Sequence, residues 1–421
     1  MLIDFKITNY RSIKSPQTLS LLGGSGAELP QNLYEATIDG TKTIRLVQST
    51  VIYGANAAGK SNIVGGLNFM RGFIVYSSKE SQQGDEIPIE PFLFDHDNKE
   101  QPTELEITFT IGKTRYVYGF VIDRFRVYEE WLYTYPAGRI QKLFSRQYDK
   151  EKESYDWKFS PKFKGEKNSW KAQTRDNALF LSTAVQLNCE QLKPVFDYFK
   201  KDIIVISARE THISPMDSFL YSKTVEGKKE LLKFLQLADA TIQDFSIETE
   251  TFSVDHPPFN ILSEEIKDNL TNKHSGKEVI KKITLFHGDI ALEMTEESDG
   301  TNKLFALAGL WCDVFLHGQV LVIDELNNSL HPILIKHLVE LFSNPNINKH
   351  GAQLIFTTHD TSLLDAEIFR RDQIWFVEKD KNNATQLYPL LDFSPRKAEV
   401  IGKGYLQGRY GALPYIGNWG F

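Results

Sequence analysis

The sequence feature that most constrains the fold is an apolar run that leads directly into Gly54-Ala55-Asn56-Ala57-Ala58-Gly59-Lys60-Ser61-Asn62. Gly54 and Gly59 let the backbone curl without a Cβ clash, so successive N–H groups can point at one anion. Lys60 can reach the β- and γ-phosphates of a nucleoside triphosphate, and the Ser61 hydroxyl can ligate Mg²⁺. The apolar spacing downstream predicts a helix from about Lys60 to Tyr76, whose positive N-terminal end faces the same anion. The pattern indicates a phosphate-binding loop rather than an ordinary glycine-rich turn.

A second apolar run, Val320-Leu321-Val322-Ile323, ends in the two acids Asp324 and Glu325. A continuous apolar run is typical of a strand buried on both faces, so we expect it inside a parallel sheet. Asp324 is then placed to hold the Mg²⁺ shell beside Ser61. Glu325 points toward the γ-phosphate, where a carboxylate can orient and polarise the attacking water.

A third apolar strand, predicted over residues 352–356, ends in Thr357-Thr358-His359-Asp360. Ligands of α/β sheets bind in the crevice outside the carboxyl ends of the strands, so His359 could hydrogen-bond the γ-phosphate. Taken alone, a histidine in such a place is more often a packed loop residue. His359 is therefore a candidate only because the other two strand ends accompany it.

Two further helix starts lie near the acidic strand. Ser298-Asp299-Gly300 precedes an apolar helix predicted over residues 305–315, and on its own it reads as a capped helix start. Pro332 suits the first position of another helix, with Ser329 or His331 as its cap.

Composition and charge limit the kinds of protein that fit. A formal net charge of −7 argues against a protein that coats nucleic acid with its whole surface. Cys189 and Cys312 are the only cysteines, which is typical of a reducing cytosol and leaves no disulfide framework. The first residues lack the pattern of a signal peptide. The longest apolar stretch, 304–316, is too short to span a bilayer and contains Asp313, so we expect a cytoplasmic protein with no membrane segment.

One stretch is locally basic and aromatic. Residues 139–175 contain 11 Lys or Arg against 5 Asp or Glu, together with seven aromatic side chains. Such a stretch can track a phosphodiester backbone while its rings stack on bases. The same composition describes β-hairpins whose aromatic side chains face the core, and this second interpretation is favoured.

The remaining patterns predict an α/β fold, with a mixed, central parallel sheet beside an N-terminal antiparallel β subdomain and a helical insert. We expect an N-terminal lobe over residues 1–130, a β-hairpin and helical insert over 131–280, and a C-terminal lobe over 281–421. Within these, strands are predicted over 2–8, 17–22, 46–53, 105–111, 116–122, 125–127 and 203–206, helices over 177–200 and 226–239, and a polar connection over 252–279.

The order of the motifs resembles the P-loop ATPase heads of the ABC type found in SMC and RecF proteins. It runs through Asn9-Tyr10-Arg11-Ser12, the phosphate loop, Ser298-x-Gly300, Asp324-Glu325, Ser329-Leu330-His331-Pro332 and His359. The resemblance implies ATP and Mg²⁺ as cofactors and ATP hydrolysis as the activity.

Site roles follow from the same resemblance. It makes Glu325 the catalytic base, His359 the γ-phosphate sensor, and residues 54–62 the nucleotide-binding loop with Lys60 and Ser61 as its ligands. Ser298 and Gly300 would close on ATP held by the other subunit of a head-to-tail homodimer, or of a higher homo-oligomer. Arg11 looks like the basic residue that such heads place near the phosphates.

Some positions depart from the pattern of these heads. The signature around Ser298 lacks the transporter-like LSGGQ, and the glutamine of the usual Q-loop has no clear counterpart. Asn327 stands where many relatives carry an acid. The chain has no sustained heptads, which excludes SMC-like arms. A transporter's nucleotide-binding subunit is therefore disfavoured.

Within this superfamily the chain looks most like the ATP-binding subunits of bacterial restriction-locus and abortive-infection systems, including the PARIS type, and its tail over 405–415 resembles theirs. Some relatives fuse such a head to a Toprim nuclease, but about 60 residues follow His359 here. The resemblance therefore implies an antiviral sensor or scaffold that controls a separate effector from the same operon. A nucleic acid or a phage protein would be the trigger. The alternative is a RecF-like DNA-repair ATPase that binds DNA through residues 139–175.

Overall fold

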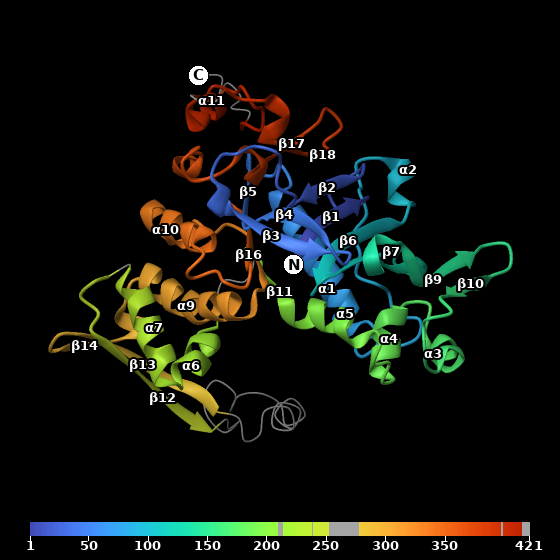
Figure 1. The fold of residues 1–421 in the computed structure, drawn as a ribbon, viewed down its shortest axis with the longest axis horizontal. Coiled ribbons are helices and arrows are strands. Elements are labelled where there is room, and N and C mark those ends of the chain that lie inside the picture. The colour runs from blue at the N-terminus through green and yellow to red at the C-terminus, as the bar shows by residue number, and fades with distance from the viewer. Residues whose placement is uncertain (209–213, 238, 252–277, 397–398, 415–421) are drawn as a thin grey trace. The chain divides into compact units, whose positions relative to one another are not determined.

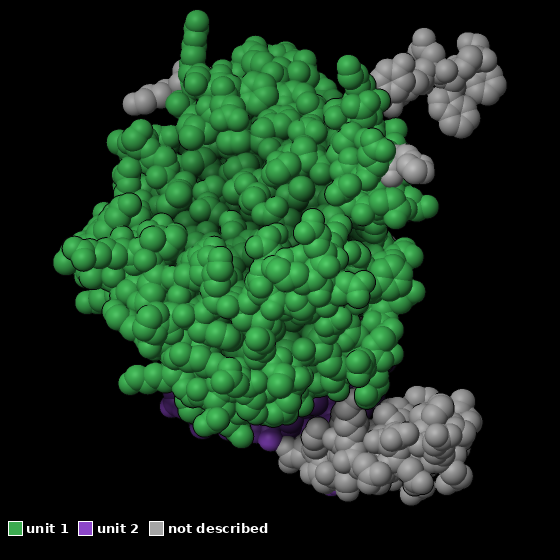
Figure 2. Space-filling view, turned by 90° about the vertical axis from the view of Figure 1, so that its right-hand side faces the viewer, with its two compact units in different colours: residues 1–211, 314–328, 335–421 green, residues 212–313, 329–334 purple. Residues whose placement is uncertain are grey.

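The structure is a computed structural model of the 421-residue chain. It describes residues 1–208, 214–237, 239–251, 278–396 and 399–414. The chain forms two compact units, which Figure 2 colours separately. Unit 1 comprises residues 1–211, 314–328 and 335–421, and unit 2 comprises residues 212–313 and 329–334. The segments expected from the sequence, 1–130, 131–280 and 281–421, have other boundaries than these two units. That three-part division stays a prediction.

A six-stranded sheet lies within unit 1, in the order β11-β15-β16-β5-β17-β18 (Figure 1). Neighbouring strands from β11 to β17 pair in parallel, and only β18 is antiparallel. Every residue of β5, β15 and β16 is buried, as expected for apolar runs inside a parallel sheet. The strands are β5 (Ser49–Gly54), β11 (Ile203–Ile206), β15 (Val320–Ile323), β16 (Gln353–Thr357), β17 (Ile374–Lys379) and β18 (Thr385–Pro389).

The pairing of these strands sets which residues meet at the sheet edge. Ile323 pairs with Phe356, and Thr357 pairs with Ile52. Because the strands are parallel, the residues that follow β5, β15 and β16 emerge together at one edge. The phosphate loop, the two acids and His359 all follow these three strands, so the sheet brings them together. The predicted fold class, an α/β fold around a mixed central sheet, is confirmed.

A second sheet of unit 1 has seven strands, all antiparallel, in the order β10-β9-β8-β7-β6-β1-β2. It includes residues 141–159, so the antiparallel subdomain extends past residue 130 into the expected insert. Its strands are β1 (Leu2–Thr8), β2 (Gln17–Ser20), β6 (Thr103–Ile111), β7 (Thr114–Ile122), β8 (Val127–Thr134), β9 (Gln141–Asp149) and β10 (Ser154–Phe159).

Helix α1 (Lys60–Tyr76) has the bounds predicted from the sequence and contacts both sheets of unit 1. Its apolar residues join one continuous core with side chains of both sheets, and Gly66 approaches strand β1 so closely that a Cβ would clash with Ile7. The close approach of α1 to β1 therefore requires glycine at this position. Burial of this face fixes the direction in which the N-terminal end of α1 points.

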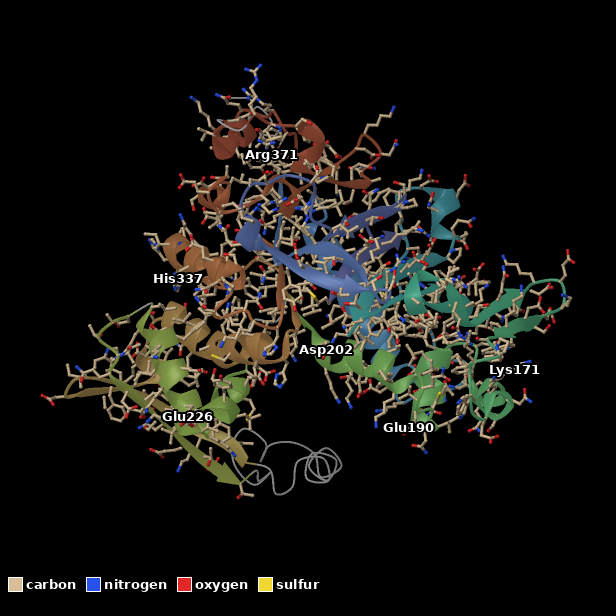
Figure 3. The ribbon with its side chains drawn as sticks, in the orientation of Figure 1. Lys171, Glu190, Asp202, Glu226, His337 and Arg371 are labelled. Atoms are coloured by element: carbon tan, nitrogen blue, oxygen red, sulfur yellow. The ribbon has the colours of Figure 1, made fainter. Side chains whose placement is uncertain are left out.

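The basic stretch is part of this core. Phe144, Phe163 and Trp170 are at most 6% exposed, and Trp157 and Phe159 pack against them. Many of its exposed residues are charged, such as Lys171 on α3 (Lys167–Gln173), which Figure 3 labels. The favoured interpretation, aromatic side chains that face the core, agrees with this packing.

A buried ion pair joins the stretch to the sheet. Glu130 and Arg146 lie opposite each other on β8 and β9, 3.0 Å apart, and both side chains are inaccessible to water. The Glu130 carboxylate also accepts the backbone N–H groups of Phe180 and Leu181, at 2.7 and 3.0 Å, and the Tyr118 hydroxyl at 2.9 Å. It thereby satisfies free N–H groups at the start of α4 and offsets part of the cost of burying two charges.

Two predicted strands differ from the structure. The run over 46–53 breaks at Gln48, because residues up to Val47 pair in the hairpin of β3 (Leu33–Ile38) and β4 (Lys42–Val47), whereas Ser49 begins β5. The run over 125–127 is mostly a turn, because the Asp123 carboxylate accepts N–H groups of Phe125 and Arg126 at 2.7 and 2.8 Å. Strand β8 begins only at residue 127.

The helix predicted over 177–200 is also interrupted. The structure has three short pieces there: α4 (Phe180–Gln186), α5 (Lys193–Asp197) and a π-helical turn (Tyr198–Asp202). Asn188 lies between α4 and α5, and its φ of +64° is outside the range of an α-helix. The smaller elements of unit 1 are α2 (His96–Lys99), α3 (Lys167–Gln173), α4 (Phe180–Gln186), α5 (Lys193–Asp197), a π-helical turn (Tyr198–Asp202), α11 (Ile401–Leu406) and 3₁₀ turns Pro30–Asn32, Pro136–Gly138, Thr361–Leu363, Arg371–Gln373 and Leu390–Phe393.

Unit 2 packs a three-stranded sheet, in the order β12-β13-β14, against helices. Phe245 on β12 meets Phe305 on α9 edge to face, with ring centres 5.5 Å apart. The elements of unit 2 are α6 (Met216–Ser222), α7 (Val225–Gln236), β12 (Asp244–Thr251), β13 (Glu278–His287), β14 (Ile290–Glu293), a 3₁₀ turn (Met294–Glu296) and the start of α9 (Asp299–His317). Helix α10 (Pro332–Ser343) begins in unit 2 and continues in unit 1. The predicted polar connection falls outside the described residues over 252–277, as does residue 415 of the tail.

Candidate active site

The phosphate loop is held in a conformation that only small residues allow. Gly59 has a φ of +115°, and a Cβ on it would clash with the Thr385 hydroxyl. Lys60 is 6% exposed, and its Nζ donates to the carbonyls of Gly54 at 2.9 Å and Ala55 at 3.1 Å. Burial lowers the Lys60 pKa to about 8, although the carboxylates of the acidic strand end oppose this shift. The loop therefore holds a poorly solvated amine at the start of α1.

A chain of hydrogen bonds anchors the loop to distant segments. Asn62 Nδ2 donates to Ser12 Oγ at 2.6 Å, and Ser12 Oγ lies 2.7 Å from Thr385 Oγ1. The Thr385 hydroxyl donates to the Ala58 carbonyl at 2.8 Å, so the Ser12 hydroxyl donates to Thr385. The first strand turn and strand β18 thus fix the loop from the side opposite Lys60. Ala57, at the crest of the loop, has a φ of +61°.

The two acids after β15 are oriented by a threonine of the next strand. Thr357 Oγ1 donates to Asp324 Oδ1 at 2.6 Å and accepts the Glu325 N–H at 2.7 Å. Asp324 is 6% exposed, and Glu325 has a φ of +55°, which turns the chain sharply after the strand. The next threonine, Thr358, donates to Asn327 Oδ1 at 2.9 Å. Thr357 of β16 therefore fixes the carboxylate of Asp324 and the backbone of Glu325.

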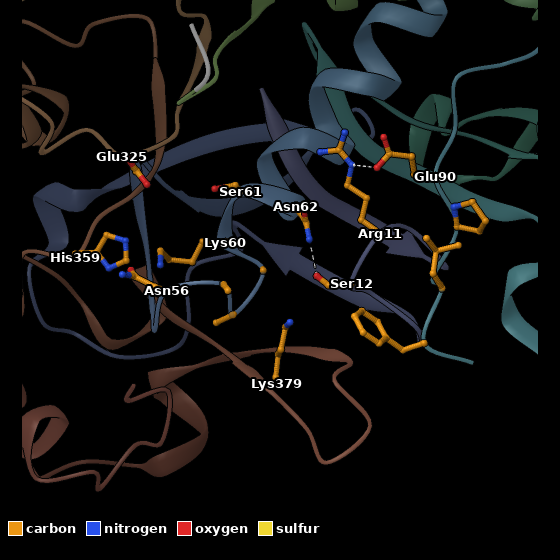
Figure 4. A pocket seen from close by; sticks show the side chains of 16 residues that line it. Arg11, Ser12, Asn56, Lys60, Ser61, Asn62, Glu90, Glu325, His359 and Lys379 are labelled. Atoms are coloured by element: carbon orange, nitrogen blue, oxygen red, sulfur yellow. Dashed lines mark hydrogen bonds and ion pairs between the residues drawn. The ribbon is translucent and has the colours of Figure 1, made fainter. Parts of the chain in front are cut away.

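A cavity of about 630 Å³ opens over this sheet edge. Glu325, His359 and the loop from Asn56 to Asn62 line one end of it, as Figure 4 shows. Burial and the nearby Lys60 charge lower the His359 pKa, so its imidazole is neutral at pH 7. This end of the cavity thus combines the Lys60 ammonium, the Glu325 carboxylate and the neutral imidazole of His359.

Apart from Arg11, the other end of the cavity is lined by residues that the sequence did not indicate. Arg11 is paired with Glu90 through Nε at 3.0 Å, as drawn in Figure 4. Leu93 and Phe94 are 60% and 64% exposed although both are apolar. The Lys379 ammonium lies 5.7 Å from the centre of the Phe94 ring. This end offers an apolar surface with cations beside it.

The structure brings most of the predicted site residues together. Asn56, Ala57, Ala58, Gly59, Lys60, Ser61, Asn62, Arg11, Glu325 and His359 line the cavity. Gly54 and Ala55 contribute the carbonyls that hold Lys60, and Asp324 lies directly behind Glu325. Ser298 and Gly300 belong to unit 2, where Ser298 Oγ accepts the Thr301 N–H at 3.1 Å.

Several residues of the site have no sequence signature. Glu90, Phe94, Lys379 and Thr385 come from three separate segments of the chain, and none has a spacing that relates it to the phosphate loop. Thr357 carries a weak signal, because it ends an apolar strand next to His359. A search for polar residues at the ends of all buried strands would have found Thr357 and Lys379.

Three features define a P-loop ATPase of the AAA/ABC class: the parallel sheet, the phosphate loop that follows β5, and the acidic pair that follows β15. A protein-family profile described as "AAA domain, putative AbiEii toxin, Type IV TA system" matches residues 49–365. The chain belongs to this family.

Three solved structures are similar at low identity. The SmcHead bound to the C-winged helix domain of ScpA is 14% identical over 92% of this chain and 97% of its own, with a TM-score of 0.43. A Pyrococcus furiosus Smc head domain with an extended coiled coil, bound to the C-terminal domain of ScpA, is 12% identical over 93% and 97%, with a TM-score of 0.40. The recombination mediator RecF with ATP is 14% identical over 92% and 99%, with a TM-score of 0.36. Because these scores are low, the assignment depends on the family match and the site geometry.

A search of curated proteins found no match. Within the residues that the structure describes, no helix combines the length and apolar character needed to cross a membrane.

Proposed function

We propose that the chain binds ATP with Mg²⁺, pairs with a second copy around the nucleotide, and uses hydrolysis to control a separate effector in anti-phage defence. The observation that carries the ATP site is the convergence of Lys60, Glu325 and His359 on one cavity at the carboxyl edge of the sheet. Lys60 is held by the Gly54 and Ala55 carbonyls, and the Glu325 backbone is held by Thr357 of β16. A catalytic site assembled in this way needs little rearrangement before reaction.

The residues present fit a Mg²⁺–triphosphate group. Gly59, with a φ of +115°, lets the loop curl where a Cβ would clash with Thr385, and Lys60 brings a positive charge whose ammonium is held by the Gly54 and Ala55 carbonyls. Hydroxyl and carboxylate oxygens are suitable Mg²⁺ ligands, and Ser61 and Asp324 would supply them. Held by these residues, Mg²⁺ would supply positive charge that offsets the negative charge of the phosphates during phosphoryl transfer.

The remaining groups act on the attacking water and the γ-phosphate. Glu325 accepts a proton from the water, and its backbone N–H is fixed by Thr357. His359 is neutral at pH 7 and donates one ring N–H to a γ-oxygen, a bond that strengthens as negative charge moves onto that oxygen. Lys60 holds the β- and γ-phosphates by charge.

The far end of the cavity suits the nucleoside. An exposed aromatic ring is a platform on which a base can stack, and Phe94 lies at this end with Lys379 beside it. Arg11 can contribute positive charge to the phosphates once the Glu90 ion pair is exchanged for them. We infer that the phosphates lie toward Lys60 and the base toward Phe94.

Ser298 and Gly300 are proposed to act on the ATP of a second copy. They lie at the N-terminal end of α9, a 19-residue helix whose partial positive charge favours an anion. The Gly300 Cα faces the Ser329 carbonyl so closely that an added Cβ would lie 3.1 Å from it. Small size at this position supports a role in which another molecule's phosphate approaches the backbone.

A role in antiviral defence is supported by the family description, which names a putative toxin of a toxin–antitoxin system. Such a system needs a component that changes state on infection and a component that harms the cell or the phage. We propose that this ATPase is the first component, that its trigger is a nucleic acid or a phage protein, and that the second is encoded beside it. Deletion without any phage phenotype would argue against this role.

The ATPase proposal is tested with Glu325→Gln and Lys60→Ala in the full chain. Glu325→Gln should keep ATP binding, accumulate an ATP-bound dimer, and lower kcat by a factor on the order of 10³ because the proton acceptor is lost. Lys60→Ala should abolish binding, because the triphosphate loses its main compensating charge. Calorimetry measures ATP binding, light scattering measures dimer formation, and phosphate release measures kcat. Turnover of Glu325→Gln at the parent rate would show that the base is misassigned.

A RecF-like DNA-binding ATPase is the second candidate, because Lys158, Lys162 and Lys164 are exposed along one basic stretch. The aromatic side chains between them face the core, so binding would depend on phosphate contacts and would fall steeply with salt. Reversing these three charges together with that of Lys167 should then remove any stimulation of ATP hydrolysis by DNA. Stimulation that persists in the reversed variant would exclude this surface.

A further inference from the structure

The turn that precedes α9 is held by a histidine from strand β13 of unit 2. His287, the last residue of β13, lies 2.8 Å from Thr241 through Nδ1 and 2.8 Å from the Glu297 carboxylate through Nε2. Glu297 directly precedes Ser298. The side chains of His287 and Glu297 are only 15% and 8% exposed, so water competes weakly for this contact.

The direction of each hydrogen bond follows from what the partners can donate. A carboxylate only accepts, so Nε2 of His287 donates to Glu297. Thr241 Oγ1 also lies 2.6 Å from the Asp239 carboxylate, and hydrogen bonds from Thr241 lower the pKa of Asp239. The Thr241 hydroxyl therefore lies between Asp239 and Nδ1 of His287, and the imidazole bridges the Thr241 turn and the residue before Ser298.

Glu297 passes this anchoring to the residues that follow it. Its carbonyl accepts Asn302 Nδ2 at 3.3 Å, and the Asn302 N–H donates to the Ser298 carbonyl at 2.9 Å. Ser298 Oγ in turn accepts the Thr301 N–H. The side chain of Glu297 is therefore fixed to β13 while its backbone is fixed to the first turn of α9.

We propose that His287 is a positioning residue for Ser298 and Gly300, and that the β12–β13–β14 sheet acts on the pairing of two copies through it. This inference rests on the proposed role of Ser298 and Gly300. Strand β13 pairs with β12 along its length and ends at His287, so a displacement of the sheet moves the imidazole and with it Glu297. The ATP site of unit 1 supplies none of these contacts.

The test compares His287→Ala and His287→Gln in the full chain carrying Glu325→Gln. Alanine should weaken ATP-dependent dimerisation about tenfold, since the hydrogen bonds of His287 to Thr241 and Glu297 are both lost. ATP affinity at protein concentrations too low for pairing should stay within about twofold, because Lys60 and its loop are unchanged. Glutamine should restore part of the pairing, because its amide N–H can donate to Glu297 as Nε2 of His287 does. The matched control is Lys282→Ala. Lys282 lies on β13, as His287 does, and its substitution removes an exposed ion pair with Glu293 of β14.

Gly300→Val separates failure of this inference from failure of the proposed function. If Gly300→Val weakens pairing and His287→Ala does not, the positioning role is overturned and the dimer stands. If neither variant weakens pairing, the role of Ser298 and Gly300 fails, and the inference fails with it. An equal loss in Lys282→Ala would also overturn it. Should His287→Ala not fold, Glu297→Leu removes the acceptor of the same hydrogen bond: weakened pairing supports the role, and unchanged pairing overturns it.

Discussion

ATP affinity should fall steeply above pH 8 because of Lys60. Burial lowers the pKa of its ammonium to about 8 in the empty site. A bound triphosphate stabilises the charged form, so the pKa rises on binding and the protein takes up a proton. The contribution of the charge is complete below the pKa of the empty site and is lost as pH rises through it. His359 does not titrate in this window, since its own pKa is lowered below 6.5.

The size of the effect follows from the fraction of charged Lys60. At pH 9, one unit above its pKa of about 8, roughly one empty site in eleven carries the ammonium. ATP affinity should then be about tenfold weaker than at pH 7, or about 1.4 kcal/mol. The γ-phosphate, with a second pKa near 6, is already ionised across this range.

Calorimetry measures this directly. Titrating ATP into the Glu325→Gln protein at pH 8, in two buffers of different ionisation enthalpy, should reveal uptake of about half a proton per ATP. Lys60→Arg is the matched control, because a guanidinium stays charged at pH 9 and its affinity should not change with pH. Affinity that is constant from pH 7 to 9, with no proton uptake, would refute the argument that Lys60 is desolvated.

Three substitutions test other parts of the structure. Thr357→Val should lower kcat about 10- to 100-fold, because the Glu325 N–H loses its buried acceptor, whereas Thr357→Ser should retain activity. Phe94→Ala should raise KM for ATP several-fold, by about 1 kcal/mol, at unchanged kcat, because a stacking surface is lost. Glu130→Ala should lower the free energy of unfolding by about 3–5 kcal/mol, measured by urea titration, because the buried Arg146 charge loses its partner.

Each of these has a result that would contradict it. Equal kcat for Thr357→Val and the parent would mean that the hydroxyl does not orient the acids. Phe125 is 65% exposed and absent from the cavity lining, so an equal rise in KM for Phe125→Ala would show that the Phe94 effect is not specific. A urea midpoint for Glu130→Ala like that of an exposed-site variant would remove the stabilising role of the pair.

Local sequence patterns predicted the elements that carry the chemistry. The apolar spacing of α1, the continuous apolar run of β15 and the polar ends of β15 and β16 are all encoded within short windows. Parallel pairing then dictates that Asp324, Glu325 and His359 emerge at one edge beside Lys60. This part of the site follows from local pattern and sheet geometry alone.

The remainder depends on contacts that no short window contains. Glu90, Phe94 and Lys379 reach the cavity because loops far apart in the sequence fold over the same sheet edge. The aromatic side chains after residue 139 alternate as a strand requires, but alternation does not say which face is buried. The break at Gln48 is equally hidden, because strand-forming residues lie on both sides and only the identity of their partner strands separates β4 from β5.

The two ends of the chain are joined through the centre of unit 1, and this affects how the protein is made. The Leu2 N–H donates to Gln353 Oε1 across 351 positions, and Thr385 completes the contacts around Ala58. Strand β5 emerges early from the ribosome, but both of its neighbours are translated hundreds of residues later. We therefore expect a nascent chain to capture no nucleotide until synthesis has passed β18. A stalled translation product would then be a target for proteases and not a partly active enzyme.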